Sequence, residues 1–174
     1  PPHVSCPPPT SSIANSSCQA AVPNVVGGVT TSDNCSTGSA ITLTQSPVAG
    51  TLVGLGQTTI TVTATDEASN QATCTTTFTV TDGTPPSFTQ NPVATPQVLW
   101  PPDHRMKDVY LNNYAASDNC SAVSYKINVS SNESTHGTSD GDRSPDWIVV
   151  DSTSTHPIHL QLRAERGNGK DARV

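Results

Sequence analysis

The chain has 174 residues, which suits one or two small domains but not a large enzyme. Its 14 Asp and Glu outnumber its 8 Lys and Arg, and this net charge of −6 argues against a nucleic-acid partner. No apolar run approaches the roughly 18 residues of a membrane span, so we expect no membrane insertion. Thr and Val dominate while charged residues make up only 13%, a composition that favours strands and predicts an all-β fold.

Short strands are predicted along the first half of the chain. Four segments bounded by Pro, Gly or Asn come first: His3–Cys6, Gln19–Val26, Ile41–Gln45 and Thr51–Leu55. Residues 58–65 and 73–81 then alternate small polar and apolar side chains, the two-residue period of half-buried strands. Residues 66–70 between them form a tight loop, so this pair is predicted to be a hairpin.

An internal repeat divides the chain. Asp-Asn-Cys-Ser occurs at 33–36 and again at 118–121, while Pro-Pro occurs at 1–2 and again at 85–86. Both landmarks indicate a period near 85 residues, which is the size of an immunoglobulin-like β-sandwich. We therefore expect two tandem sandwiches, residues 1–84 and residues 85–174, with a stiff linker of Asp-Gly and Pro-Pro around the junction.

The second predicted module differs from the first at its end. In the first module an Asp-x-x-x-Asn loop and a final strand follow the long strand after Thr58, whereas LQLRAER is followed only by Gly167-Asn-Gly169 and a few more residues. This comparison predicts a second sandwich that lacks its closing strands. An excised segment of a longer chain accounts for the same observation.

Five cysteines point to an oxidising compartment. They form no CxxC pair and no zinc spacing, so disulfides are expected, with buried free thiols as the alternative. Four lie within the first 74 residues and can pair in three ways. We predict Cys6–Cys74, which ties the opening strand to the closing strand, together with Cys18–Cys35, and this leaves Cys120 over.

Five N-x-S/T sequons agree with an extracellular, secreted or cell-surface location. Glycans are expected at Asn15, Asn128 and Asn132. Asn34 and Asn119 are poorer acceptors, because each precedes a cysteine and is itself a candidate ion ligand.

Motifs for catalysis are absent from the sequence, which contains no G-x-S-x-G, no H-E-x-x-H and no phosphate-binding Gly loop. The five dispersed histidines are expected on surface loops, and the acidic stretch Asp140, Asp142 and Asp146 is expected to be a solvated loop. Trp100 and Trp147 suit either sugar stacking or packing, and we favour packing for both.

Calcium is the cofactor that the sequence suits best. In a sandwich the loop with Asp33 and Asn34 and the hairpin loop with Asp66 and Asn70 lie at one end, beside the N-terminus. Asp82 at the opposite end is expected to face the next module's Asp118 and Asn119. Asp and Asn oxygens suit a hard cation, although the commonest role of these residues is to cap turns.

Several motifs carry a family resemblance. The CPPP start, DNCS, the run TQSPVAGTLVGLGQTTITVTATDEASNQATC and the exit TVTDGTPP make residues 1 to about 84 resemble a hyalin-repeat (HYR) domain. LWPPDHRM, DNCS, SSNES, PDW and LRAER make the second module similar to immunoglobulin-like modules of bacterial extracellular proteins. These resemblances imply adhesion or scaffolding and no reaction.

The resulting functional hypothesis is a non-enzymatic extracellular structural or adhesive protein. Its tandem modules would form part of a surface stalk or filament by head-to-tail association with other copies. The alternative is a carbohydrate- or protein-binding accessory module of a larger secreted enzyme. For assembly by strand exchange, the expected donor is the Pro-rich N-terminus PPHVSCPPPT. The expected acceptor is an open apolar face of Val149, Val150, Ile158, Leu160 and Leu162.

Overall fold

Strands make up nearly all the regular structure of this protein. The computed structural model describes residues 1–34, 40–130, 145–151 and 157–164. In these residues fourteen strands and one short 3-10 helix occur. The predicted class, an all-β fold of immunoglobulin-like sandwich type, is confirmed.

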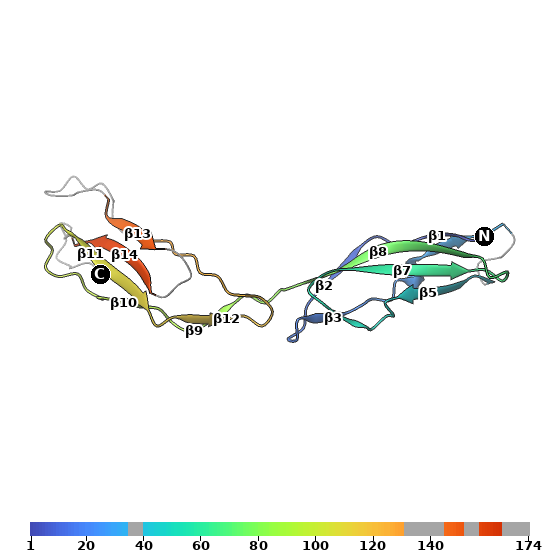
Figure 1. Ribbon diagram of the computed structural model, residues 1–174, viewed down its shortest axis with the longest axis horizontal. Helices are drawn as coiled ribbons and strands as arrows, with labels where there is room; N and C mark the ends of the chain where they lie inside the picture. Colours follow the sequence, from blue (N-terminus) through green and yellow to red (C-terminus); the bar gives the residue numbers. More distant parts are fainter. Residues whose placement is uncertain (35–39, 131–144, 152–156, 165–174) are drawn as a thin grey trace. The chain divides into compact units, whose positions relative to one another are not determined.

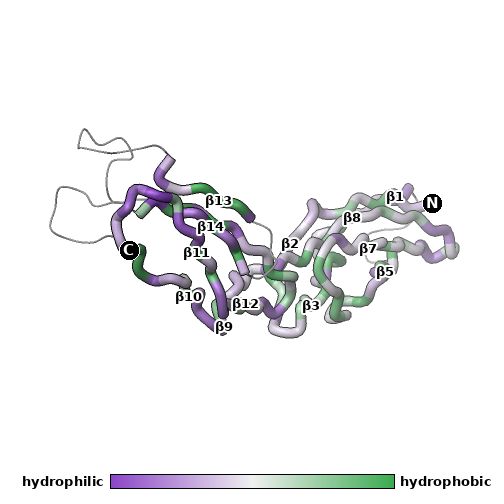
Figure 2. The backbone as a smooth tube through the Cα atoms, turned by 60° about the vertical axis from the view of Figure 1, so that its left-hand side comes forward, coloured by the Kyte–Doolittle hydropathy of each residue, from purple (hydrophilic) through white to green (hydrophobic). Residues whose placement is uncertain are grey.

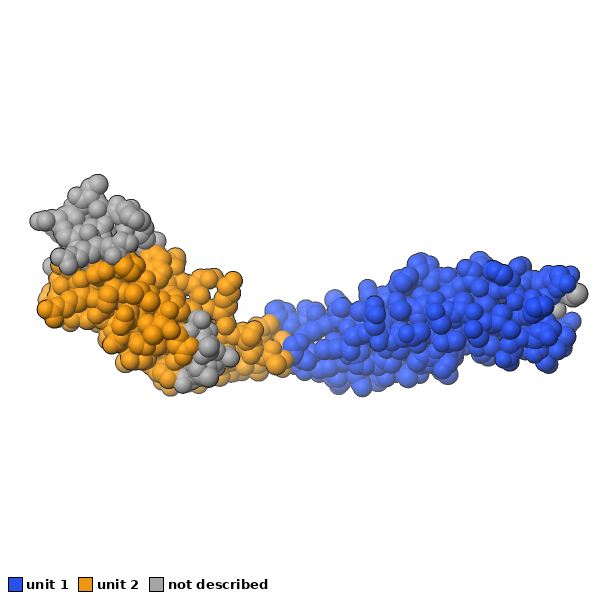
Figure 3. All heavy atoms as spheres, turned by 45° about the horizontal axis from the view of Figure 1, so that its top comes forward, with its two compact units in different colours: residues 1–85, 119–121 blue, residues 86–118, 122–174 orange. Residues whose placement is uncertain are grey.

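The chain forms two compact units, which Figure 3 shows in blue and orange. Unit 1 comprises Pro1–Pro85 together with the short segment Asn119–Ser121, and unit 2 comprises Pro86–Asp118 with Ala122–Val174. The chain therefore leaves unit 1 after Pro85, returns for three residues and leaves it again. The returning segment carries Cys120.

A four-stranded sheet forms one layer of unit 1. Its order is β2 (Thr10–Ile13), β8 (Gln71–Thr81), β7 (Gly56–Thr65) and β5 (Thr42–Ser46), as Figure 1 shows. The hairpin β7–β8 is the predicted one, with Thr65 opposite Gln71 at its closed end. β2 runs parallel to β8, and β5 runs antiparallel to β7.

Two short ribbons complete unit 1. β1 (His3–Ser5) pairs with β4 (Thr30–Ser32), and β3 (Gln19–Ala21) pairs with β6 (Leu52–Gly54), both antiparallel. A 3-10 turn, η1 (Val26–Gly28), leads into β4. Because β1 and β2 are both paired inside unit 1, the N-terminal segment is not the free extended donor that the strand-exchange hypothesis required.

Alternation along β7 and β8 builds the core of unit 1. Every second residue is buried from Ile60 to Ala64 on β7 and from Thr76 to Val80 on β8, and Ile60 and Val62 have no exposed surface. They pack with buried residues of the shorter segments and of β8: Ala20, Val22, Val25, Phe78 and Val80. Cys6 and Cys74 pack against this cluster and are bonded to each other, with Cα atoms 5.7 Å apart.

Unit 2 has a second four-stranded sheet. Its order is β10 (Val93–Thr95), β11 (Met106–Asn112), β14 (Ile158–Arg163) and β13 (Trp147–Asp151), with each neighbouring pair antiparallel. β9 (Ser87–Gln90) and β12 (Ala115–Ser117) form a separate two-stranded ribbon.

The core of unit 2 lies under β11 and β14. Val109, Ile158 and Leu160 are at most 5% exposed and pack with Tyr114. The expected open apolar face is therefore wrong for Ile158 and Leu160. On β14 they lie opposite Leu111 and Val109 of β11, and both pack in the core of unit 2. Val149 and Val150 on β13 are exposed.

Candidate functional site

One arginine joins three of the five sequence motifs of the second module. Arg163 on β14 donates from Nη1 to the carbonyl oxygen of His104 at 2.9 Å. Its Nη2 and Nε both donate to the carbonyl oxygen of Pro145, at 2.9 and 3.2 Å. The motifs LWPPDHRM, PDW and LRAER thus meet at a single guanidinium group, whose fixed fork of donors suits several carbonyl acceptors.

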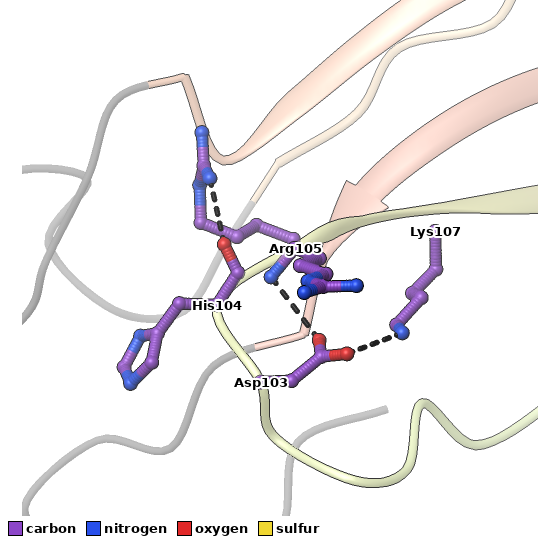
Figure 4. Close-up of polar contacts among 5 residues, drawn as sticks. Asp103, His104, Arg105 and Lys107 are labelled. Carbon is purple, nitrogen blue, oxygen red and sulfur yellow. Dashed lines mark hydrogen bonds and ion pairs between the residues drawn. The ribbon is translucent and has the colours of Figure 1, made fainter.

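The loop before β11 is closed by its own polar groups. Asp103 accepts hydrogen bonds from Lys107 Nζ at 2.6 Å and from the backbone N–H of Arg105 at 3.1 Å (Figure 4). The hydrogen bond from Lys107 is the largest cause of the lowered pKa of Asp103. His104 in this loop has a positive φ of 56°, and its N–H donates to the carbonyl of Ala164 at 3.0 Å. We call Asp103, His104, Lys107 and Arg163 the loop clasp, and its contacts stabilise the fold of unit 2.

A row of polar and aromatic side chains lies on the outer face of β11 and β14. Asp108 contacts His159 Nε2 at 2.8 Å and accepts from Gln161 Nε2 at 3.0 Å. Tyr110 stacks on His159 with ring centroids 4.6 Å apart. The hydrogen bonds from Gln161 and then His159 lower the pKa of Asp108. His159 is thus on a strand, and its expected place on a surface loop is wrong.

Trp100 lies at the surface beside this row. It is 63% exposed, so packing in the core, one of the two kinds of packing expected, is wrong for Trp100, and packing between modules stays a prediction; Trp147 is half-buried on β13. Trp100 lines a pocket of about 270 Å³ together with other apolar and charged residues: Pro96, Val98, Leu99, Lys107 and Asp108. Its exposure makes the Trp100 ring available for sugar stacking, the alternative to packing.

At one end of unit 1 the structure brings Asp33 and Asp66 within electrostatic reach of each other. The side chain of Asp33 is only 2% exposed, and its Oδ2 lies 3.6 Å from the N-terminal amine of Pro1. Asp66 accepts from the Asn70 backbone N–H at 2.8 Å and from Asn70 Nδ2 at 2.9 Å. The side-chain hydrogen bond from Asn70 is the largest effect and lowers the pKa of Asp66, while burial and the charge of Asp33 oppose it. Asn34 is exposed beside Asp33.

The second predicted group of calcium ligands does not lie in one unit. Asp82 and Asn119 belong to unit 1, and Asp118 belongs to unit 2. The carboxylate of Asp82 accepts from Ser121 Oγ at 2.5 Å and from the Thr84 backbone N–H at 3.0 Å. Asp82 therefore caps its own turn and holds the returning segment.

No group of three or more His, Cys, Asp or Glu side chains that could hold a metal ion occurs among the described residues. The calcium hypothesis also counts Asn oxygens as ligands, and it stays a prediction. Of the acidic stretch expected to be solvated, Asp140 and Asp142 lie outside the described residues.

The second disulfide differs from the predicted one. Cys18 is bonded to Cys120, with Cα atoms 5.2 Å apart, so the predicted Cys18–Cys35 bond is wrong. The physical reason is that the segment Asn119–Ser121 packs with unit 1 and brings Cys120 to Cys18. Cys35 itself lies outside the described residues.

Four of the five sequon asparagines are exposed: Asn15, Asn34, Asn119 and Asn128. Asn15 Oδ1 accepts from the backbone N–H groups of Ser17 and Gln19, at 2.9 and 3.2 Å. Asn128 lines an apolar pocket. Asn132 lies outside the described residues.

In unit 1 the Cys6–Cys74 bond joins the residue that follows β1 to β8, the last strand of the unit. Residues 1–82 match the HYR domain. The matched family is a non-enzymatic, adhesion-type domain of extracellular proteins, and the two disulfides are consistent with an extracellular location. The match ends at Asp82, so the resemblance of unit 2 to bacterial immunoglobulin-like modules rests on its own motifs alone. No curated protein matches the chain.

The part of the chain that the structure describes contains no helix both long and apolar enough to cross a membrane.

The sequence motifs did not by themselves reveal the role of Arg163 or the polar row. The signal for the row was present, because Asp108, Tyr110, His159 and Gln161 alternate with the buried residues Val109 and Leu160.

Proposed function

We propose that this chain is a non-enzymatic structural protein of an extracellular stalk or filament, in which copies associate head to tail. The HYR domain supports an adhesion-type role, and an edge of unit 2 supports self-association. The edge is strand β13.

β13 is the observation that carries the proposal. It pairs with β14 on one side and, among the described residues, with no strand on its other side. Ile148, Val149 and Val150 on this strand are 42, 37 and 50% exposed, and Figure 2 colours the middle of the strand as hydrophobic. An exposed apolar edge strand pairs readily with another chain.

The complementary surface that we propose is β2 in the HYR domain of a second copy. β2 is an edge strand whose four residues are all exposed, and Ile13 at its end is 65% exposed. Pairing of β13 with β2 joins two different surfaces, so each added copy presents a new free edge. Such heterologous association produces open chains rather than closed dimers.

The test is the association state of the purified chain as its concentration rises, followed by sedimentation and electron microscopy. The wild type is expected to form extended polymers, and Val150→Lys is expected to abolish them because a charge blocks the edge. Leu52→Lys is the matched control, since Leu52 is 54% exposed on β6 in neither proposed surface.

Mixing two variants separates head-to-tail association from symmetric pairing. Val150→Lys keeps β2 intact, and Ile13→Lys keeps β13 intact. Neither variant polymerises alone under this proposal, but a mixture of the two forms a heterodimer and stops there. A wild type that stays monomeric at its highest soluble concentration, or a Val150→Lys variant that still polymerises, contradicts the proposal.

Exposed Trp100 favours a second candidate function, carbohydrate binding. The pocket beside it presents an aromatic surface next to the charged groups of Lys107 and Asp108, a combination that suits a sugar ring and its hydroxyl groups. Binding of soluble polysaccharides that Trp100→Ala abolishes, with Val98→Ala as the control in the same pocket, supports this function.

A further inference from the structure

We infer that Asn128 carries an N-linked glycan whose first sugar ring lies on Phe88 and Tyr125, covering an apolar pocket of unit 2. This inference goes beyond the proposed function and does not depend on association between copies. It rests on two observations in unit 2, a pocket and an acceptor sequence.

The pocket has a volume of about 210 Å³ and is mainly apolar and aromatic. Its lining residues are Phe88, Pro92, Leu111, Tyr114, Tyr125, Lys126, Ile127, Asn128 and Ile158. Pockets for drug-sized free ligands usually begin at about 300 Å³. This one is therefore better suited to a single ring than to a larger independent ligand.

Phe88 lines this pocket, and its exposure to solvent needs an explanation. Although the chain contains only two phenylalanines, Phe88 is 57% exposed, whereas Phe78 is in the core of unit 1. The Phe88 ring lies 6.4 Å from that of Tyr125, which in turn packs edge-on against Tyr114 at 4.9 Å. Tyr114 is buried and Tyr125 is half-buried, so Phe88 is the exposed end of this aromatic cluster, and an exposed apolar surface that continues from the core can mark a site that something covers.

Asn128 lies at the edge of this cluster and belongs to the sequon Asn128-Val129-Ser130. Burial alternates along this segment, so that Tyr125, Ile127 and Val129 pack on the core while Asn128 and Ser130 are exposed. The acceptor amide and the hydroxyl two residues later are therefore both accessible. Tyr125 is held in place, because its hydroxyl accepts a hydrogen bond from the Ala116 N–H at 2.9 Å.

The chemistry of attachment requires a donor, which we name as a polyprenyl-diphosphate-linked oligosaccharide used by an oligosaccharyltransferase. Asn128 Nδ2 attacks C1 of the first sugar, forming the N–C1 bond as the C1–O bond to the diphosphate breaks. The diphosphate leaves with the electron pair of that bond, and Nδ2 loses one proton. No oxidant or reductant takes part.

A sugar attached at Asn128 has an apolar surface that matches the pocket. One face of a pyranose ring consists of C–H groups, which carry partial positive charge, and the face of an aromatic ring is negative. The linkage starts at a residue that already lines the pocket, so the first ring reaches Phe88 without ordering a long tether. The hydroxyl groups of that ring stay in water.

The experiment uses the full chain secreted from a eukaryotic host and trimmed with an endoglycosidase that leaves one N-acetylglucosamine on each occupied asparagine. Peptide mapping is expected to find the sugar at Asn128. Removing it with Asn128→Gln is expected to lower the melting temperature of unit 2 by about 4 °C or more. In the Phe88→Ala background the same substitution is expected to have little effect, which a double-mutant cycle measures.

Asn15→Gln is the matched control, since Asn15 is an exposed sequon of unit 1. Its effect on melting is expected to be the same with and without Phe88. A second readout needs no variant, because nuclear Overhauser contacts between the sugar and the Phe88 ring are expected in the wild type. An unmodified Asn128, a sugar effect that is unchanged in Phe88→Ala, or a sugar without contacts to Phe88 overturns the inference.

Discussion

Cys18 and Cys120 are bonded to each other although 102 positions separate them in the sequence. Cys120 belongs to a three-residue segment that returns to unit 1 from the sequence of unit 2. The hydrogen bond between Ser121 Oγ and Asp82 holds the same segment. Everything between residues 18 and 120 therefore lies in one closed covalent loop, which also contains Cys74 of the other disulfide.

This connectivity predicts how far the chain extends under force. When the ends are pulled, only residues 1–18 and 120–174 can lengthen, about 73 residues or roughly 250 Å at about 3.5 Å per residue. In Cys18→Ser with Cys120→Ser the remaining cross-link is Cys6–Cys74, which keeps the residues between 6 and 74 from extending. Residues 1–6 and 74–174 then extend to roughly 370 Å. Single-molecule stretching measures these lengths.

Cys6→Ser with Cys74→Ser is the control for that measurement. Because Cys6–Cys74 lies outside the shortest covalent path, its loss is expected to leave the extended length at roughly 250 Å. A wild type that extends as far as Cys18→Ser with Cys120→Ser would show that Cys18 and Cys120 are not bonded in the protein.

Arg163 is expected to be the most sensitive polar residue of unit 2. Arg163→Ala leaves the carbonyls of His104 and Pro145 without their donor, and hydrogen bonds from charged groups contribute about 1.5–3 kcal/mol each. We expect a loss of about 2 kcal/mol or more in the free energy of unfolding of unit 2, measured by denaturant titration.

Two further variants test whether the fork of Arg163 matters. Arg163→Lys keeps the charge but cannot reach both carbonyls with a planar group, so it is expected to recover only part of the loss. Arg105→Ala is the control, because exposed Arg105 forms its hydrogen bonds to Asp103 and Ala164 with backbone groups, which the substitution keeps. A similar loss for Arg105→Ala and Arg163→Ala would contradict the role of the guanidinium group.

The long strands of unit 1 were predictable, whereas two of its short strands were not. Small polar and apolar side chains alternate in residues 58–65 and 73–81, a pattern that indicates half-buried strands. These two segments form most of β7 and β8. β2 was missed because its sequence, Thr-Ser-Ser-Ile, does not alternate and all four residues are exposed. β4 is only three polar residues long and exists through its pairing with β1.

The arrangement of distant loops was partly predictable. The sandwich topology predicted Asp33 near Asp66, because strand order determines which loops share an end, and the charge of Asp33 acts on the pKa of Asp66. The partner of Cys18 was not predictable in this way. It depends on a three-residue segment returning from beyond the repeat boundary, which no local pattern of hydrophobicity records.

Calcium binding at Asp33 and Asp66 is a prediction that a titration can test. A cation beside these two carboxylates offsets their mutual repulsion, and extracellular calcium sites have dissociation constants of about 0.1–1 mM. At about ten times that constant, calcium is expected to stabilise unit 1 by about 1.4 kcal/mol.

Differential scanning calorimetry with and without calcium measures this change. Asp33→Asn is expected to remove the calcium response, and Glu67→Gln, an exposed carboxyl on the neighbouring turn, is expected to retain it. A melting temperature of the wild type that is the same in about 10 mM calcium and in a chelator rules the site out, since that concentration saturates any site in this range.

Acid is expected to destabilise unit 1 through Asp66. The side-chain hydrogen bond from Asn70 is the main reason that the folded-state pKa of Asp66 lies below its ordinary value of 3.8. The folded state therefore favours the carboxylate, so this contribution is complete above about pH 5 and is lost as the pH falls through 3.8 towards the folded-state pKa.

Asp66→Asn cannot accept from Asn70 with both side-chain atoms, because its own amide presents a donor to Asn70 Nδ2. The variant is thus less stable at neutral pH, and its melting temperature is expected to fall less steeply between about pH 5 and pH 2 than that of the wild type. Glu67→Gln, which alters a carboxyl on the same turn, is expected to keep the wild-type slope. If Asp66→Asn also keeps that slope, the acid sensitivity of unit 1 comes from another carboxyl group.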